Sequence, residues 1–270
     1  MSFNLKNIFA AAGLASTLLL SGCGDKAVVD NNKITVGVIA GSEAQVAEVA
    51  AQVAKEKYGL EVELITFSDY ITPNAALDEG SIDVNAFQHK PYLDQQIKDR
   101  DYKFAIVGNT FVYPIAGYSS KITSLDELQD GDLIAVPSDP TNLGRSLMLL
   151  EQQGLLVLKE GAGLSATVLD IVSSPKNLDI VELEAAQLPR SLDDVSLAII
   201  NTTYASSIDL SPEKDGLFVE DKESSYVNLI VAREDNVNAE NVQNFLKAYQ
   251  TDTVYNAAMK IFKDGVVKGW

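Results

Sequence analysis

The sequence has very few of the residues on which most enzymes and metal proteins depend. It contains one cysteine, Cys23, and one histidine, His89, among 270 residues. A single cysteine excludes an intrachain disulfide and any cysteine-based zinc site in the folded part. A catalytic triad or a histidine-rich metal site would have to be built around His89 alone. Because P-loop, HExxH and GxSxG motifs are also missing, the sequence predicts no enzyme, no metal and no cofactor.

Positive charge is scarce as well. The chain has 21 lysines and arginines against 38 aspartates and glutamates, which gives a formal net charge of −17 at pH 7. Nucleic-acid binding depends on basic side chains that neutralise phosphates, so we predict no nucleic-acid partner. We interpret the acidity as solvation of exposed helix faces rather than as an acidic docking patch.

Long apolar runs are absent except near the N-terminus. After Lys6, an apolar stretch covers residues 8–20 and ends in Leu20-Ser21-Gly22-Cys23, the order typical of an export signal. The stretch is too short to cross a bilayer comfortably, although a retained anchor helix is an alternative. Its last four residues resemble a lipobox, which implies cleavage before Cys23 and acylation of its sulfur.

This N-terminus predicts where the protein is located. We predict a signal peptide over residues 1–22, a lipidated Cys23, and a flexible tether over residues 23–32 that joins the lipid to the folded part. Acyl chains on Cys23 would hold the protein on a bilayer without a transmembrane helix. We therefore expect a bacterial cell-envelope protein that is anchored to a membrane and faces the periplasm.

The rest of the chain alternates between strand and helix patterns. A strand from Ile34 is followed by a helix that we expect to open with a capping box of Ser42 and Gln45 and to end at Gly59. Repetition of this β-α-β pattern predicts a parallel sheet covered by helices. A second series begins near residue 124 and includes an expected helix over residues 167–172.

The chain then returns to the first series through a predicted strand and two terminal helices. This order predicts two lobes joined by two hinge crossings, with lobe I formed by residues 33–115 and 226–270 and lobe II by residues 116–225. The fold class is therefore α/β, and a cleft between the lobes is the expected ligand site.

Aromatic residues and the histidine gather at strand ends of the first series. Phe87, His89 and Tyr92 lie at a strand-to-helix junction, and Tyr70 follows the preceding strand. Clefts of α/β sheets open at such positions, so the four side chains could face one pocket. Aromatic contacts with a thioether sulfur contribute roughly 0.3–1.5 kcal/mol each. The alternative is that these residues are ordinary core residues.

Polar candidates come mainly from the second series. Arg145 is expected in the first turn of a helix, where free backbone donors and a guanidinium together would bind a carboxylate. Asn201 follows a buried apolar run, and Asn228 lies inside an apolar strand. A buried asparagine needs hydrogen-bond partners, which either a ligand or the neighbouring backbone would supply. A surface arginine is the alternative for Arg145.

Several segments of the sequence resemble one known family. They are NAFQHKPYL (85–93), GNTFVYPIAGY (108–118), PTNLGR (140–145), LPRSLDD (188–194), INTTYA (200–205) and YVNLIV (226–231). Together with the lipobox and the final Lys-Gly-Trp, they closely resemble the MetQ/NlpA family of methionine-binding lipoproteins over nearly the whole chain.

The resemblance implies a type II periplasmic-binding-protein fold whose lobes close on L-methionine. It also implies delivery to an inner-membrane methionine ABC importer, made of a permease and an ATPase. The side-chain pocket would be formed by Tyr70, Phe87, His89 and Tyr92. Arg145 would pair with the carboxylate, and Asn201 and Asn228 would bind the backbone groups of the amino acid.

Three alternatives stay open. The protein could be a related envelope lipoprotein that binds methionine derivatives or short methionyl peptides. It could be a surface lipoprotein that binds an envelope or host partner without transport. An exported enzyme that uses His89 as acid or base is the third, and turnover of a substrate would distinguish it.

Overall fold

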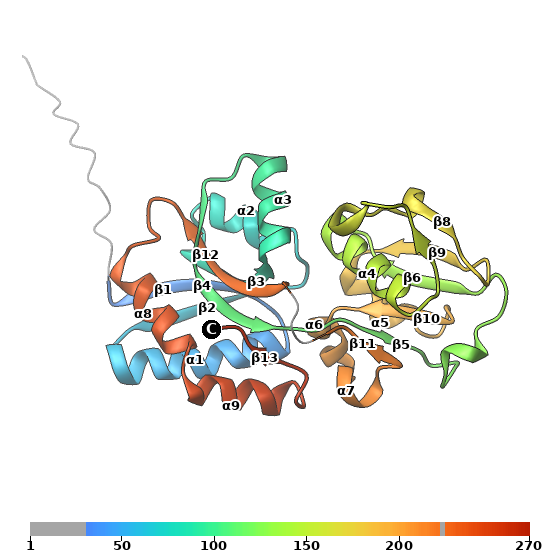
Figure 1. Cartoon of the computed structure of the whole chain (residues 1–270). Helices are drawn as coiled ribbons and strands as arrows, with labels where there is room; N and C mark the ends of the chain where they lie inside the picture. Colours follow the sequence, from blue (N-terminus) through green and yellow to red (C-terminus); the bar gives the residue numbers. More distant parts are fainter. Residues whose placement is uncertain (1–30, 222–224) are drawn as a thin grey trace, which may run out of the picture. The chain divides into compact units, whose positions relative to one another are not determined.

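The fold is known from a computed structural model that describes residues 31–221 and 225–270 (Figure 1). The predicted signal peptide, Cys23 and the tether up to residue 30 lie outside the described residues. Within the described part, none of the helices combines the length and the apolar character needed to span a membrane.

The first sheet has six strands. They are β1 (Lys33–Ile39), β2 (Glu61–Phe67), β3 (Val84–His89), β4 (Phe104–Val112), β12 (Val227–Arg233) and β13 (Val267–Lys268). Their spatial order is β13-β4-β12-β3-β1-β2. β1 pairs in parallel with β2 and β3, whereas β12 pairs antiparallel with both β3 and β4. The first four strands therefore run in one direction, and the C-terminal strand β12 is inserted between β3 and β4 in the opposite one.

The prediction of an all-parallel first sheet was therefore wrong. The β-α-β pattern of residues 33–112 correctly gives strands of one direction, but it cannot show that a strand from the far end of the chain enters the middle of the sheet. β12 belongs there because it is apolar on both faces, with Asn228 to Ala232 all buried. Strands buried on both faces are typical of sheet interiors.

Helices cover both faces of this sheet, as Figure 1 shows. They are α1 (Ser42–Tyr58), α2 (Thr72–Asp78), α3 (Lys90–Arg100), α8 (Glu240–Tyr249) and α9 (Asp252–Ile261). The apolar sides of α1, α8 and α9 form one core with the sheet, and α2 and α3 contribute to a smaller core with β2, β4 and β12. Both cores exclude apolar surface from water, which is the main stabilising contribution to a fold of this kind.

The second sheet has five strands. They are β5 (Ala116–Tyr118), β6 (Leu133–Pro137), β9 (Asp179–Leu183), β10 (Leu197–Ile200) and β11 (Phe218–Val219). Their order is β11-β5-β10-β6-β9, with β6 parallel to β9 and β10, and β5 antiparallel to β10 and β11. The helices of this part are α4 (Pro140–Gln152), α5 (Leu188–Ser191), α6 (Thr202–Ala205) and α7 (Pro212–Asp215).

Two connections join the sheets. Residues 113–115 link β4 to β5, and the segment after β11 leads back to β12. The backbone N–H of Glu220 donates to the Ile115 carbonyl over 2.9 Å, so the two connections are bonded to each other. The predicted lobe boundaries, between residues 115 and 116 and between 225 and 226, stay predictions.

Two local predictions were wrong. α1 begins at Ser42, and Gly41 precedes it at a φ of 97° without any side-chain cap, so Ser42 and Gln45 form no capping box. Residues 167–172 contain a single 3-10 turn, Val168–Asp170, followed by strand β8 (Ile171–Ser173), which pairs with β7 (Val157–Leu158). Thr167 and Asp170 form a capping box around that one turn, and the β-branched residues after it favour a strand. The predicted end of α1 is confirmed, since Gly59 is left-handed with a φ of 64°.

Candidate functional site

A cavity lies between elements of the two sheets. All seven residues predicted from the sequence line it, and so do five others. The full lining is Tyr70, Phe87, Gln88, His89, Tyr92, Tyr113, Asn142, Arg145, Asn201, Thr202, Thr203 and Asn228. The structure therefore brings together residues that are far apart in the sequence, as the strand-end positions predict.

Secondary structure explains why these side chains converge. Phe87 and His89 are at the carboxyl end of β3, and Tyr92 is in the first turn of α3. Asn201 directly follows β10 and precedes α6. The carboxyl ends of parallel strands open onto clefts in α/β proteins. Asn228 comes from β12, which pairs with His89 and so reaches the same end of the first sheet.

One end of the cavity is aromatic. The ring centroid of Tyr70 lies 5.9 Å from that of Phe87 and 6.3 Å from that of Tyr92. The Tyr92 hydroxyl donates to the Tyr70 carbonyl over 2.7 Å, which fixes the orientation of the Tyr92 ring. Burial raises the pKa of the Tyr70 phenol well above its ordinary value, so this end of the cavity is uncharged.

His89 is buried, with 6% of its surface exposed, and both ring nitrogens are bonded. Nδ1 accepts from the Tyr92 backbone N–H over 3.2 Å, and Nε2 lies 3.2 Å from Oδ1 of Asn142. Because Nδ1 is an acceptor, Nε2 carries the hydrogen and donates to Asn142. Burial, with a further contribution from the charge of Arg145, lowers the pKa of His89 to about 3, so the imidazole is neutral at physiological pH.

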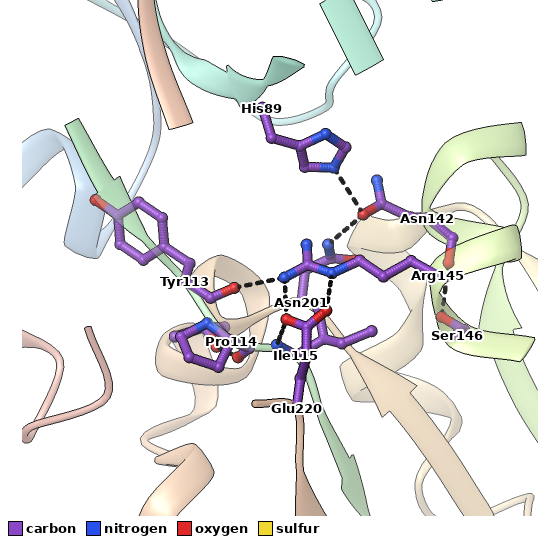
Figure 2. Close-up of polar contacts among 10 residues, drawn as sticks. His89, Tyr113, Pro114, Ile115, Asn142, Arg145, Ser146, Asn201 and Glu220 are labelled. Carbon is purple, nitrogen blue, oxygen red and sulfur yellow. Dashed lines mark hydrogen bonds and ion pairs between the residues drawn. The ribbon is translucent and has the colours of Figure 1, made fainter. Parts of the chain in front are cut away.

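Asn142 is a cavity residue that the sequence analysis missed. Its Oδ1 accepts from His89 and from Nδ2 of Asn201, which lies 3.1 Å away. Its Nδ2 donates to both carboxylate oxygens of Asp139, over 3.1 and 2.9 Å, and Asp139 also accepts from its backbone N–H. Asn142 therefore links the N-terminus of α4 to both sheets (Figure 2). Its position in the 140–145 segment was the available signal.

Arg145 differs from the prediction in two respects. α4 begins at Pro140, so Arg145 is in the second turn rather than the first. It is also buried, with 3% exposed. Its guanidinium is already paired with a carboxylate of the chain itself, that of Glu220. Nε donates to Oε1 over 2.8 Å, and Nη2 donates to Oε2 and to the Tyr113 carbonyl (Figure 2).

Glu220 could not be recognised as a site residue from local patterns, because it lies 75 positions from Arg145 in a polar segment. Its carboxylate also accepts a long hydrogen bond, 3.4 Å, from the Ile115 N–H. No described residue accepts a hydrogen bond from Nη1 of Arg145, and Figure 2 shows that atom turned from Glu220 toward the side of His89. The ring of Tyr226 packs 4.2 Å from the guanidinium carbon.

The two predicted asparagines have different partners. Nδ2 of Asn201 donates to Asn142, while its buried Oδ1 has no hydrogen-bond partner among the described residues. Nδ2 of Asn228 donates to the Phe87 carbonyl over 2.9 Å, so neighbouring backbone satisfies this group. A buried acceptor without a partner is costly, and Asn201 therefore offers its oxygen to a donor that enters the cavity.

A buried acid lies behind the cavity wall. Glu43, in the first turn of α1, has 2% of its surface exposed, and its Oε1 accepts from the Thr203 hydroxyl over 2.5 Å. Burial raises its pKa to about 8, so the carboxyl group is mainly protonated at neutral pH. The sequence did not reveal this residue, because its partner is 160 positions away.

The described part of the chain contains no group of three or more His, Cys, Asp or Glu side chains that could hold a metal ion.

Comparison with known proteins gives close matches over the whole folded region. The model of the NlpA lipoprotein family matches residues 34–270. A relative from Vibrio cholerae, named as a probable D-methionine-binding lipoprotein MetQ, is 74% identical over 270 residues, and the alignment covers 100% of each chain.

Solved structures agree with these sequence matches. A crystal structure of the methionine binding protein MetQ has a TM-score of 0.88 and 71% identity, with 89% of this chain and 99% of that chain covered. A periplasmic substrate-binding protein of an ABC transporter from Coxiella burnetii has a TM-score of 0.85 and 52% identity, covering 87% and 100%.

A nutrient-binding protein from Burkholderia cenocepacia, solved bound to methionine, has a TM-score of 0.86 and 48% identity, covering 88% and 100%. The predicted fold class, a two-lobed α/β periplasmic-binding-protein fold, is confirmed by these structures.

Proposed function

We propose that this chain, which belongs to the NlpA lipoprotein family, captures L-methionine between its lobes and delivers it to an ABC importer. The observation that carries the proposal is the division of the cavity into an aromatic end and a polar end. Tyr70, Phe87 and Tyr92 form the aromatic end, and Arg145 and Asn201 belong to the polar end. An amino acid with an apolar side chain requires such a division.

The aromatic end suits a thioether. Sulfur makes favourable contacts with ring edges and faces, and the three rings surround this part of the cavity without any charged group. A long unbranched side chain such as that of methionine can adapt to the tilted arrangement of these rings. The names of relatives and solved neighbours, which refer to methionine and D-methionine, support the same assignment.

The polar end suits the charged groups of an amino acid. Nη1 of Arg145 is the donor that we assign to the ligand carboxylate, and Oδ1 of Asn201 is the acceptor that we assign to its ammonium group. Asn228, whose Nδ2 is held by the Phe87 carbonyl, would contact the ligand through its oxygen. Asn142 and His89 would hold the two sides of the cavity in place.

Binding without chemistry fits the site better than catalysis. A general base needs a free nitrogen within reach of a substrate proton, and both nitrogens of His89 are bonded to the protein. Closure of the lobes around the ligand would then be the working step. The partners of this step would be the permease and the ATPase of an inner-membrane importer.

We further propose that acyl chains on Cys23 hold the protein on a membrane of the bacterial envelope, with the folded part facing the periplasm. The lipobox-like sequence and the lipoprotein names of relatives support this location. Labelling with a radioactive fatty acid would test it: the wild-type chain should be labelled, and a Cys23→Ala variant should not.

Calorimetry tests the binding function. The full chain, purified in detergent, would be unfolded and refolded to remove carried-over ligand, then titrated with L-methionine, D-methionine, leucine, glutamine and methionyl peptides. We expect one-to-one binding of methionine and no heat with leucine or glutamine. Refolded protein that binds none of these ligands would overturn the proposal, and preferred binding of methionyl peptides would favour the related-lipoprotein alternative.

A further inference from the structure

The pairing of Arg145 with Glu220 has a consequence for ligand charge. Arg145 is the only charged side chain among the described residues that line the cavity. This positive charge is balanced, however, because both Nε and Nη2 of Arg145 donate hydrogen bonds to the Glu220 carboxylate. Both partners are shielded from water, with side-chain exposures of 3% and 12%. Burial of this kind makes charge balance far more important than it is at the surface.

Glu220 is held in place independently of Arg145. Its backbone N–H donates to the Ile115 carbonyl over 2.9 Å, and its carboxylate accepts from the Ile115 N–H. The two connections between the sheets therefore fix the carboxylate in position. A group fixed in this way costs little reorganisation when a ligand arrives.

The other titratable groups that line the cavity add no charge. Burial keeps His89 neutral, and burial also keeps the phenols of Tyr70 and Tyr92 protonated. Glu43, behind Thr203, is mainly protonated at neutral pH for the same reason. The charges of Arg145 and Glu220 cancel, so this pair and the other lining residues together carry no net charge, while the carboxylate of Asp139 lies behind Asn142, outside the lining.

We infer that Glu220 is a specificity-determining residue, which neutralises Arg145 so that the cavity selects a zwitterion over an anion or a cation of the same shape. The inference rests on the proposed function and deepens it. A free amino acid carries an ammonium and a carboxylate with no net charge, and such a ligand leaves the site balanced. An arginine without Glu220 would instead give a cavity suited to simple carboxylate anions.

A series of ligands that differ in charge tests this inference. L-methionine is the zwitterion, 2-hydroxy-4-(methylthio)butanoate is an anion with a hydroxyl in place of the ammonium, and L-methioninamide is a cation at slightly acidic pH. Affinities of the full chain for all three would be measured by calorimetry at one salt concentration. For the wild type, we expect the anion and the cation each to bind at least about 100-fold more weakly than methionine.

The decisive quantity is the ratio of the affinities for the anion and the cation. Glu220→Gln removes one negative charge with little change of shape, and we expect it to raise this ratio at least tenfold over the wild-type value. A general loss of stability would lower both affinities together and leave the ratio unchanged. Glu182→Gln is the matched control, because Glu182 is an exposed residue of β9 that does not line the cavity, and its ratio should equal that of the wild type.

A double variant covers the case in which Glu220→Gln does not fold. Arg145→Met combined with Glu220→Met removes the pair while keeping the cavity neutral, and buried ion pairs can often be replaced by apolar residues without loss of stability. All affinities should fall, but the ratio should stay within a few-fold of the wild-type value.

The outcomes separate this inference from the proposed function. An unchanged ratio in Glu220→Gln, or a shift above tenfold in the double variant, would overturn the role of Glu220 while methionine binding stands. A refolded wild type that binds none of the three ligands would overturn the proposed function and this inference with it.

Discussion

His89 and Asn142 join the two sheets across the cavity, with Nε2 of His89 donating to Oδ1 of Asn142 over 3.2 Å. The bond connects the end of β3 to the first turn of α4. It also fixes the tautomer of the histidine, since Nδ1 accepts from the Tyr92 N–H. A neutral histidine therefore serves here as an orienting donor rather than as a proton carrier.

Asn142→Ala should weaken methionine binding by roughly 10- to 100-fold. The substitution removes the acceptor for both His89 and Asn201, and each lost hydrogen bond costs about 0.5–1.5 kcal/mol. Calorimetric titration measures the effect. Asn244→Ala on α8 is the control, because Asn244 does not line the cavity and its loss should leave the affinity unchanged. An affinity for Asn142→Ala equal to that of the control would remove this residue from the site.

Arg145→Ala should weaken methionine binding strongly and also destabilise the fold. Without the guanidinium, the Glu220 carboxylate is left largely buried and unpaired, which costs roughly 3–5 kcal/mol. Denaturation by urea measures the loss.

Asn228→Ala should cost about 1 kcal/mol of stability and still weaken binding, because Asn228 is held by a single hydrogen bond to the Phe87 carbonyl. Equal stabilities of the two variants would contradict this difference.

The Glu43→Gln variant should become increasingly more stable than the wild type as the pH rises. The pKa of Glu43 is raised from 4.5 to about 8 in the folded protein, so the native state retains a proton that the unfolded chain has lost over that range. The wild type therefore loses stability as the pH rises from 4.5 towards 8, by up to roughly 4 kcal/mol. The unfolding free energies of wild type and Glu43→Gln should agree near the lower pH and diverge towards the higher one. A difference independent of pH would show that Glu43 does not titrate in this way.

His89 should produce the opposite slope on the acid side. Its pKa is lowered from 6.5 to about 3 in the folded protein, so below pH 6.5 the unfolded chain takes up a proton that the native state does not. This contribution to stability is present above pH 6.5 and is lost as the pH falls towards 3. His89→Gln should therefore lose less stability than the wild type on acidification, as measured by thermal unfolding at several pH values. Identical profiles would indicate that the imidazole is charged in the native state.

Most of the cavity residues could be predicted from the sequence, because several of them occupy positions that a local pattern identifies. Phe87, His89 and Tyr92 stand at a strand-to-helix junction, and Asn201 follows a buried apolar run. Such positions lie at the cleft of an α/β fold whatever the details of packing. The buried apolar run before Asn201 is strand β10, and the two predicted terminal helices are α8 and α9, because their apolar periodicity is strong.

The residues that the sequence analysis missed form hydrogen bonds with residues far away in the sequence. Glu220 and Glu43 look like ordinary acidic residues in the sequence, and only the fold places them beside Arg145 and Thr203. The same limit explains the mistaken arrangement of the first sheet, because no local pattern shows where β12 will pair. Asn142 could have been predicted as a cavity residue, since it lies in the same short segment as Arg145.

The position of β12 has a consequence for how the protein folds during synthesis. β12 fills the gap between β3 and β4, so neither of those strands can complete its backbone hydrogen bonds along this side until residue 233 has been made. The strands of the second sheet, by contrast, all lie within residues 116–219. A nascent chain thus keeps its first sheet incomplete until almost all of it has been translated.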